Sequence, residues 1–327
     1  MNALTRFRIA RTVCRFLPPL IAQRVRSAIY SESLARKFPL EVFGRAITGS
    51  NWSGRTDDRN AYPFSVHGYF DWRRLAIALA VCEKGDSIIE IGGNIGTETI
   101  GFSDIVGSHG RVLSFEPFPA NFEILKQAVA RLQYSTNVIL YPLAVGDVYT
   151  KLYFKPPHAL NSGTGFIQHQ SSDINNIEVS CVTLDSMRNN IPVTKILFSD
   201  AEGNEYRIIQ GARDLINRDH PFLVLEACPE TLERSGDSMD LLFTDLRSLG
   251  YLVFAIERFG LREIKFSWSF KPEGNMFCCP DHQKRMIDRV QSSILRCGLC
   301  PPLPGANPMV LKRTVTNSLL SKTPGSE

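Results

Sequence analysis

The sequence has no apolar run long enough to cross a membrane and no strong excess of charge of either sign. A membrane-spanning helix needs about 20 consecutive apolar residues, and no stretch of this chain reaches that length. Lysine and arginine number 37 against 33 aspartate and glutamate residues, and no basic stripe interleaved with aromatic residues follows the N-terminus. We therefore do not expect nucleic acid as a partner.

Cysteine is present, but not in a pattern that predicts disulfides. The eight cysteines are scattered, and most stand singly in apolar stretches, where a free cysteine behaves as a small hydrophobic residue. This usage is typical of a reducing compartment, so we expect a cytoplasmic protein. The pairs Cys279/His282 and Cys297/Cys300 have spacings that zinc sites tolerate, but the reading that we favour places these cysteines in the core.

The first 30 residues are rich in arginine and have no acidic residue before Glu32. Apolar residues are interleaved with the arginines, but Arg11 and Arg15 interrupt the stretch that a signal peptide would need. The favoured expectation is a solvated helix packed on the domain or on a partner. The alternative is a basic amphipathic helix that makes a peripheral contact with an anionic membrane surface.

The chain divides into three segments. Residues 1–70 are expected to form a basic, helical and irregular N-terminal extension, with a polar break at Gly49–Asn60. Residues 71–282 alternate β-rich and helical stretches, which predicts a mostly parallel sheet with crossover helices on both faces. Residues 283–327 are expected to form a C-terminal helix and a poorly ordered tail from Pro301.

Short runs rich in β-branched and aromatic residues predict the strands. Seven are expected in the main sheet, the last two antiparallel: Ser87–Ile91, Arg111–Phe115, Asn137–Tyr141, Lys195–Ser199, Phe222–Glu226, Tyr251–Ile256 and Asn275–Cys279. Helices are expected at 71–83, from about Ile95, from Pro119, at Glu205–Asn217 and at Met239–Leu249. A long polar loop with His158 and His169 interrupts the alternation, and a loop of this length is typical of a functional one.

The most informative segment is Ile89–Gly96, where a strand ends in an acid, a glycine turn follows and a helix begins. Glycines let the backbone approach a ligand, and a helix N-terminus offers unpaired N–H groups. Glu90 disfavours a phosphate and favours a cationic, amine-bearing ligand, such as the methionine part of S-adenosylmethionine. The expected cofactor contacts here are Glu90, Gly92, Asn94 and Gly96.

A second acid ends the next strand. Glu116 lies twenty residues after Gly96 and, with Pro117, occupies the place where an acid accepts hydrogen bonds from a ribose diol. Ala144 and Val145 follow the third strand and are expected near the adenine, on their position alone. The glycine spacing is not that of a dinucleotide site. The alternative for the whole group is strand–turn–helix packing with an incidental surface glutamate.

Acids also end the fourth and fifth strands. Ligands bind beyond the carboxyl ends of the strands in open α/β sheets, so Asp200, Glu202 and Glu226 are the candidates on the acceptor side. Asp200 is a candidate base, and the three together could bind Mg²⁺ through oxygen, although we expect no metal. The alternative for Glu202 is that it only starts a helix. His169 is a further candidate base near neutral pH.

At these residues the chain resembles the FkbM family of S-adenosylmethionine-dependent methyltransferases. The resemblance runs from about residue 84 to 230, and implies a Rossmann-like class I methyltransferase fold with S-adenosyl-L-methionine as cofactor. It also implies O-methylation of a hydroxyl on a sugar, glycan or natural product, with Tyr69 in the lead-in near the methionine end of the cofactor. The matching stretches are Ile88–Gly96, Arg111–Pro117, Asn121-Phe122, Asn137–Gly146, Val182–Asp185, Lys195–Glu205 and Leu223–Glu226.

Two other functions stay open. One keeps the cofactor but methylates a nitrogen, a protein or a lipid head group instead of a small-molecule or glycan hydroxyl. The other is a non-catalytic Rossmann-like domain that only binds a partner. The presence of Glu90, Gly92, Gly96 and Glu116 argues against the second alternative.

Overall fold

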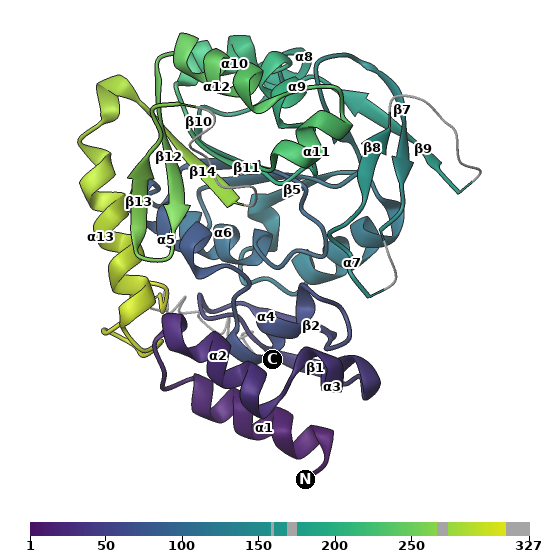
Figure 1. Cartoon of the computed structure of the whole chain (residues 1–327), viewed down its shortest axis with the longest axis vertical. Coiled ribbons are helices and arrows are strands. Elements are labelled where there is room, and N and C mark those ends of the chain that lie inside the picture. Colours follow the sequence, from purple (N-terminus) through teal and green to yellow (C-terminus); the bar gives the residue numbers. More distant parts are fainter. Residues whose placement is uncertain (158–159, 169–174, 267–273, 312–327) are drawn as a thin grey trace, which may run out of the picture.

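An eight-stranded sheet lies at the centre of the computed structural model, which describes residues 1–157, 160–168, 175–266 and 274–311 (Figure 1). The strand order is β13-β12-β14-β11-β10-β3-β4-β5. Their bounds are β3 Ser87–Ile91, β4 Arg111–Phe115, β5 Val138–Tyr141, β10 Thr194–Ser199, β11 Phe222–Ala227, β12 Tyr251–Glu257, β13 Gly260–Glu263 and β14 Gly274–Pro280.

The pairing confirms the expected fold class. Five consecutive strands run parallel to one another: β11, β10, β3, β4 and β5. Strand β14 is antiparallel to both of its neighbours, β11 and β12. The number of strands was underestimated by one. After the expected turn near Gly260, the chain continues as β13, antiparallel along the edge of β12, and its four residues are too short a run for a sequence pattern to reveal.

Both faces of the sheet are buried, as expected for parallel strands covered by helices. Ile89, Leu113 and Leu197 point to one face, which is covered by α9 Glu205–Gln210, α10 Arg213–Asp219 and α12 Met239–Ser248. Ile88 and Val112 point to the other, which is covered by α5 Trp72–Val81, α6 Thr99–Val106 and α13 Met286–Leu299. Figure 1 shows these two helical layers on either side of the strands.

Two helices differ from their predicted bounds. The helix expected from about Ile95 begins only at Thr99, because Gly92, Asn94 and Gly96 all have positive φ and hold the preceding residues in a turn. The helix expected at Glu205–Asn217 is two helices, α9 and α10, which are separated at Gly211. A Cβ at Gly211 would lie 1.9 Å from the Gly146 carbonyl oxygen, so only glycine fits this close approach of two backbones.

The N-terminal segment contains helices α1 Ala3–Cys14, α2 Pro19–Ile29, α3 Glu32–Lys37 and α4 Ala61–His67, with a hairpin of β1 Glu41–Arg45 and β2 Asn51–Arg55. Strand β2 falls within the expected polar break. Its Trp52 is buried against Phe64, and the hydroxyl of Ser50 donates a hydrogen bond to the buried Asp104 carboxylate at 2.6 Å. These anchors give the polar stretch an ordered conformation. The segment boundaries at residues 70 and 282 stay predictions.

A smaller sheet of order β6-β9-β7-β8 stands beside the main one. Its strands are β6 Ala144–Val145, β7 Thr150–Lys155, β8 Phe166–Gln168 and β9 Ile177–Val182, and α7 Pro119–Val129 begins at the expected proline. His158 and His169 lie outside the described residues, so the expectation for His169 is not tested.

The C-terminal residues 301–311 form turns against α13. The side-chain amide of Asn307 donates to the carbonyls of Cys297 and Cys300 at 2.8 and 2.7 Å. The zinc alternative finds no support within the described ranges, where the one group of acids, histidines and cysteines close enough to hold a metal is Asp200, Glu202 and Glu226. No helix in the described part of the chain is long and apolar enough to cross a membrane.

Candidate functional site

A cavity of about 320 Å³ opens at the carboxyl ends of the central strands. Ten of the residues predicted from the sequence line it: Glu90, Gly92, Asn94, Glu116, Pro117, Ala144, Val145, Asp200, Glu202 and Glu226. They come from the ends of β3, β4, β10 and β11 and from β6, because parallel strands bring their carboxyl ends to one edge of the sheet. Five of the ten are acids, so the cavity favours a cationic ligand.

Hydrogen bonds hold the turn after β3 between the ends of β4 and β10. The N–H groups of Gly92 and Gly93 both donate to the Phe115 carbonyl at 2.9 Å, and the Asp200 N–H donates to the Ile91 carbonyl at 3.0 Å. Gly92 has a φ of +86°, and a Cβ there would lie 2.1 Å from the Asp200 carbonyl oxygen. Gly92 is therefore required both by its backbone conformation and by the close approach of β10.

Glu116 orders the turn from the next strand. Its Oε2 accepts a hydrogen bond from the Asn94 N–H and its Oε1 one from the Phe118 N–H, each at 2.8 Å. Burial raises the pKa of Glu116 to about 7, although these two backbone donors favour the ionised form. The carboxylate thus couples the end of β4 to the turn after β3, at the edge of the cavity.

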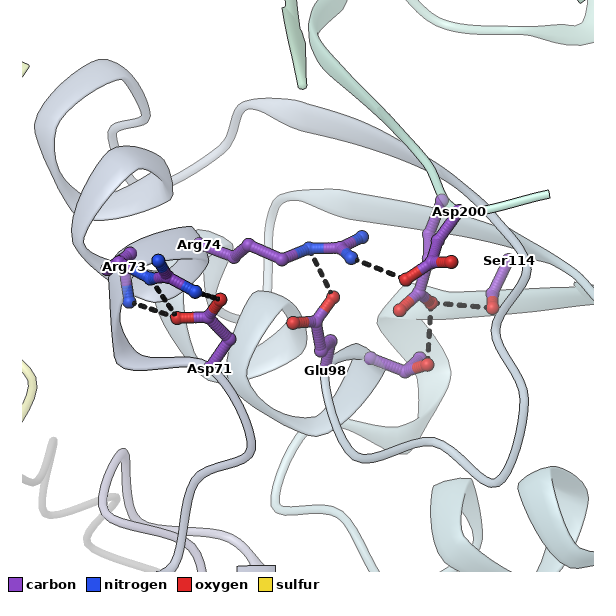
Figure 2. Close-up of polar contacts among 8 residues, drawn as sticks. Asp71, Arg73, Arg74, Glu98, Ser114 and Asp200 are labelled. Carbon is purple, nitrogen blue, oxygen red and sulfur yellow. Dashed lines mark hydrogen bonds and ion pairs between the residues drawn. The ribbon is translucent and has the colours of Figure 1, made fainter. Parts of the chain in front are cut away.

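Glu90 is a buried acid between β4 and α6. Its Oε2 accepts hydrogen bonds from the hydroxyls of Thr99 and Ser114, each at 2.6 Å, and Figure 2 shows the Ser114 contact. Burial raises the pKa of Glu90, while the two hydroxyls oppose that effect. Glu90 is only 2% exposed and lines the cavity.

Arg74 of α5 joins the site by its side chain, and the sequence analysis missed it. Its Nη1 lies 2.8 Å from Asp200 Oδ2 and its Nε 2.7 Å from Glu98 Oε2 (Figure 2). The Arg74 side chain is only 4% exposed. Its spacing gave no usable signal, because Arg74 shares one helical face with the buried Ala78 and Val81, and Arg73 shares one with the buried Ile77 and Ala80.

Arg74 has two neighbours with different roles, its partner Glu98 and the preceding Arg73. Burial raises the pKa of Glu98 to about 8, and the Arg74 guanidinium opposes this shift. The adjacent Arg73 turns away from the cavity and pairs with Asp71 at 2.6 Å, with a side chain that is 33% exposed. Of two consecutive arginines, one therefore reaches the site and the other stabilises the start of α5.

Asp200, Glu202 and Glu226 come together as predicted candidates for the acceptor side. One carboxylate oxygen from each lies within 4.8 Å of the others. Burial and the nearby Asp200 charge raise the pKa of Glu226 to about 10 and that of Glu202 to about 7. Glu226 Oε2 is buried without a hydrogen-bond partner among the described residues. At neutral pH Glu226 therefore holds a proton, whereas Asp200 forms an ion pair with Arg74.

Gly96 and Tyr69 do not line the cavity within the described structure. Gly96 has a φ of +85°, and a Cβ there would lie 3.0 Å from Leu125 of α7, so its place is explained by close packing. The Tyr69 side chain is 1% exposed and its ring stacks on His67, with 5.2 Å between ring centroids. Nothing in this geometry supports the predicted cofactor contact of either residue.

The polar loop closes over the cavity because the N-terminal segment holds it. The Ser162 N–H donates to Asp58 at 2.9 Å, and the Ser162 carbonyl accepts from the Asn121 side chain at 2.9 Å. The Asn60 amide donates to the Ser162 hydroxyl at 3.3 Å. Arg59 and Asn60 also line the cavity. Residues outside the resemblance thus form part of its wall, which the strand-end pattern could not reveal.

Comparison with protein families gives one match, over the region that contains most of this cavity. Residues 90–253 match the model of the methyltransferase FkbM domain. A search of curated proteins finds no relative of the sequence.

Several solved structures are similar at low identity. A methyltransferase FkbM from Methylobacillus flagellatus KT is 13% identical with a TM-score of 0.41, and the match covers 84% of this chain but only 58% of that one. A fibrillarin from Aeropyrum pernix with bound S-adenosyl-L-methionine is 16% identical, with a TM-score of 0.36 and coverage of 63% and 76%. An O-methyltransferase from Bacillus cereus is 15% identical, with a TM-score of 0.36 and coverage of 63% and 78%.

Proposed function

The chain belongs to the FkbM methyltransferase family, and we propose that it transfers a methyl group from S-adenosylmethionine to a hydroxyl oxygen of a sugar, glycan or natural product. The observation that carries the proposal is the convergence of a glycine turn, a ribose-type acid and an acidic cluster on one cavity. A cavity lined by six acids suits a cofactor that carries a sulfonium and an ammonium group.

The residues present fit this cofactor. Glu116 keeps lone pairs for two ribose hydroxyls after accepting its backbone hydrogen bonds. Glu98 Oε1 and Asn94 Oδ1 are buried acceptors without a hydrogen-bond partner in the described part of the chain, and both residues line the cavity. An ammonium group would satisfy such acceptors. When bound, the cofactor would supply an electrophilic methyl group.

Asp200 is the proposed base for the acceptor hydroxyl. Transfer to a hydroxyl oxygen requires the loss of one proton, which a positioned carboxylate can accept. Among the three clustered acids, Asp200 is the one that forms an ion pair, with Arg74 at 2.8 Å, and this contact holds its side chain at the cavity. Glu226 holds a proton at neutral pH and can donate a hydrogen bond to the acceptor.

We propose that the reaction needs no metal. The three carboxylates are ligands of the type that Mg²⁺ binds, but Arg74 already pairs with Asp200 Oδ2, and the raised pKa of Glu226 keeps it neutral. Both features lower the negative charge that a divalent cation would need. Treatment with EDTA should leave the rate of methyl transfer unchanged, and a rate that depends on added Mg²⁺ would contradict this proposal.

The first experiment is isothermal titration with S-adenosylmethionine and with S-adenosylhomocysteine. Both should bind the parent chain, and the Glu116→Ala variant should bind them more weakly. Labelled methyl donor can then be offered with sugar acceptors, and with amine, protein and lipid head-group acceptors as the competing classes. If a folded chain binds neither compound, the proposal fails and a non-catalytic interaction domain is favoured.

A further inference from the structure

Helix α1 presents a stripe of apolar side chains to solvent. The helix packs on the protein through Phe7, Ala10 and Cys14, which are buried. On its outer surface, Ile9 and Val13 are each 38% exposed, and Phe16, in the turn that continues α1, is 59% exposed. These three residues follow one another at intervals of four and three, so they lie on one helical face.

Three arginines form a second stripe on the solvent side of α1. Arg8, Arg11 and Arg15 recur at intervals of three and four, so they share one helical face, which Thr5 and Thr12 separate from the apolar stripe. The Nη1 atom of Arg11 donates to the Phe43 carbonyl at 3.3 Å, and that of Arg6 donates to the Ile29 carbonyl at 3.3 Å. Both partners are neutral.

The positive charge of this segment is not compensated. The six arginines of the first 30 residues have no acid before Glu32. Within the described ranges none of them forms an ion pair, and the ion pair nearest to them in the sequence is that of Arg36 with Glu32. A solvated helix packed on its own domain would not need so many charges of one sign.

The surface continues onto the hairpin. Phe43 of β1 is 72% exposed, and its carbonyl contacts Arg11 of α1. Figure 1 shows α1 at one end of the molecule, well away from the main sheet. We call the surface formed by Arg8, Ile9, Arg11, Val13, Arg15, Phe16 and Phe43 the basic–apolar face.

We propose that the basic–apolar face docks on an anionic membrane surface. Apolar side chains of a surface-lying helix enter the headgroup region, while arginines beside them contact lipid phosphates. A protein partner is disfavoured, because the centre of a protein interface is depleted of charged residues, whereas three of the seven residues of the basic–apolar face are arginines and none is an acid. A uniformly negative surface matches a segment whose charges all have one sign.

The test is flotation of the full chain with lipid vesicles. The chain should bind vesicles of phosphatidylcholine mixed with phosphatidylglycerol and should not bind phosphatidylcholine alone. Binding should weaken with salt, because the screening length falls from about 10 Å at 0.1 M to about 3 Å at 1 M ionic strength. Each arginine that is neutralised should lower partitioning about fivefold, so Arg8→Gln/Arg15→Gln should lower it about 25-fold.

The matched control is Lys284→Gln/Arg285→Gln. These exposed residues precede α13, and their replacement changes the net charge equally, so binding should stay close to that of the parent chain. Val13→Ser/Phe16→Ser should weaken binding, whereas Leu241→Ser, at a 49% exposed position of α12, should not. Equal binding to both kinds of vesicle, absence of binding, or an unaffected Arg8→Gln/Arg15→Gln variant would each overturn the proposal.

Discussion

The guanidinium of Arg74 lies 2.8 Å from the carboxylate of Asp200, although 126 positions separate the two residues in the chain. The contact joins α5, which precedes the matched FkbM domain, to the end of the central strand β10. The proposed base is thus held by a residue outside the domain that identifies the family.

Loss of Arg74 should destabilise the chain more than loss of its neighbour. Arg74→Met leaves Asp200 and the buried Glu98 without their cation, and breaking a buried pair in this way costs about 3–5 kcal/mol. Arg73→Met removes a partly exposed pair with Asp71, for which about 1 kcal/mol or less is expected. Urea unfolding at pH 9, where Glu98 is ionised, measures both free energies. Equal losses in the free energy of unfolding would show that the buried ion pairs of Arg74 stabilise the fold no more than the partly exposed pair of Arg73.

Cofactor affinity should fall as the pH drops through about 7, the value to which burial raises the pKa of Glu116. Below that pH the carboxyl is protonated and loses acceptor capacity for ribose hydroxyls, so affinity should fall by up to about tenfold per pH unit. Titration calorimetry of S-adenosylhomocysteine across this range measures the slope. The Glu116→Gln variant should bind S-adenosylhomocysteine weakly, and its affinity should not depend on pH in this range. An unchanged pH dependence in the variant would assign the titration to another group.

Replacement of Glu226 by glutamine should stabilise the fold at pH 8. The pKa of Glu226 is about 10 in the folded chain, against an ordinary value of 4.5. Between these values the folded chain holds one proton more than the unfolded chain, so the free energy of unfolding decreases as the pH rises. Glu226→Gln removes this effect.

The change in stability should therefore depend on pH. The melting temperature of Glu226→Gln should exceed that of the parent by several degrees at pH 8 and by little below about pH 4.5, where both states are protonated. Methyl transfer should decrease, because residues that strain a fold often serve function. A variant that melts below the parent at pH 8 would show that the carboxyl is solvated or paired.

Alanine at Gly92 should be far more harmful than alanine at Gly85. Both glycines have positive φ, +86° and +100°, so both variants carry backbone strain of about 1–3 kcal/mol. A Cβ at Gly85 meets nothing within 4 Å, whereas one at Gly92 would lie 2.1 Å from the Asp200 carbonyl oxygen. Thermal unfolding and cofactor titration should therefore show a larger loss for Gly92→Ala. If the two variants lose equal stability and equal cofactor affinity, the ends of β3 and β10 can move apart without a cost in free energy.

The strand-end acids were predictable because parallel strands bring their carboxyl ends to one edge of a sheet. That rule needs only strand positions, and it placed Glu116, Asp200 and Glu226 at one cavity. The parallel direction of the central strands followed in the same way from the alternation of β-rich and helical stretches.

Other features depend on contacts between distant segments, which a local pattern does not contain. Arg74 is one arginine of an adjacent pair, and only the packing of α5 against the sheet decides which of the two reaches Asp200. Trp52 gives a polar stretch the form of a strand because Phe64 covers it. The break at Gly211 depends on the backbone of Gly146, sixty-five positions earlier in the chain.

The N-terminal segment holds the polar loop through Asp58 and Asn60, and Arg59 stands in the cavity wall. The N-terminal segment and the matched FkbM domain would therefore have to remain compatible where they contact each other. A chimaera that joins residues 90–253 to the N-terminal segment of another relative should still bind the methyl donor. Part of the surface that we propose contacts the acceptor would then come from that relative. Acceptor preference could thus diversify by recombination upstream of the catalytic domain, without a substitution inside it.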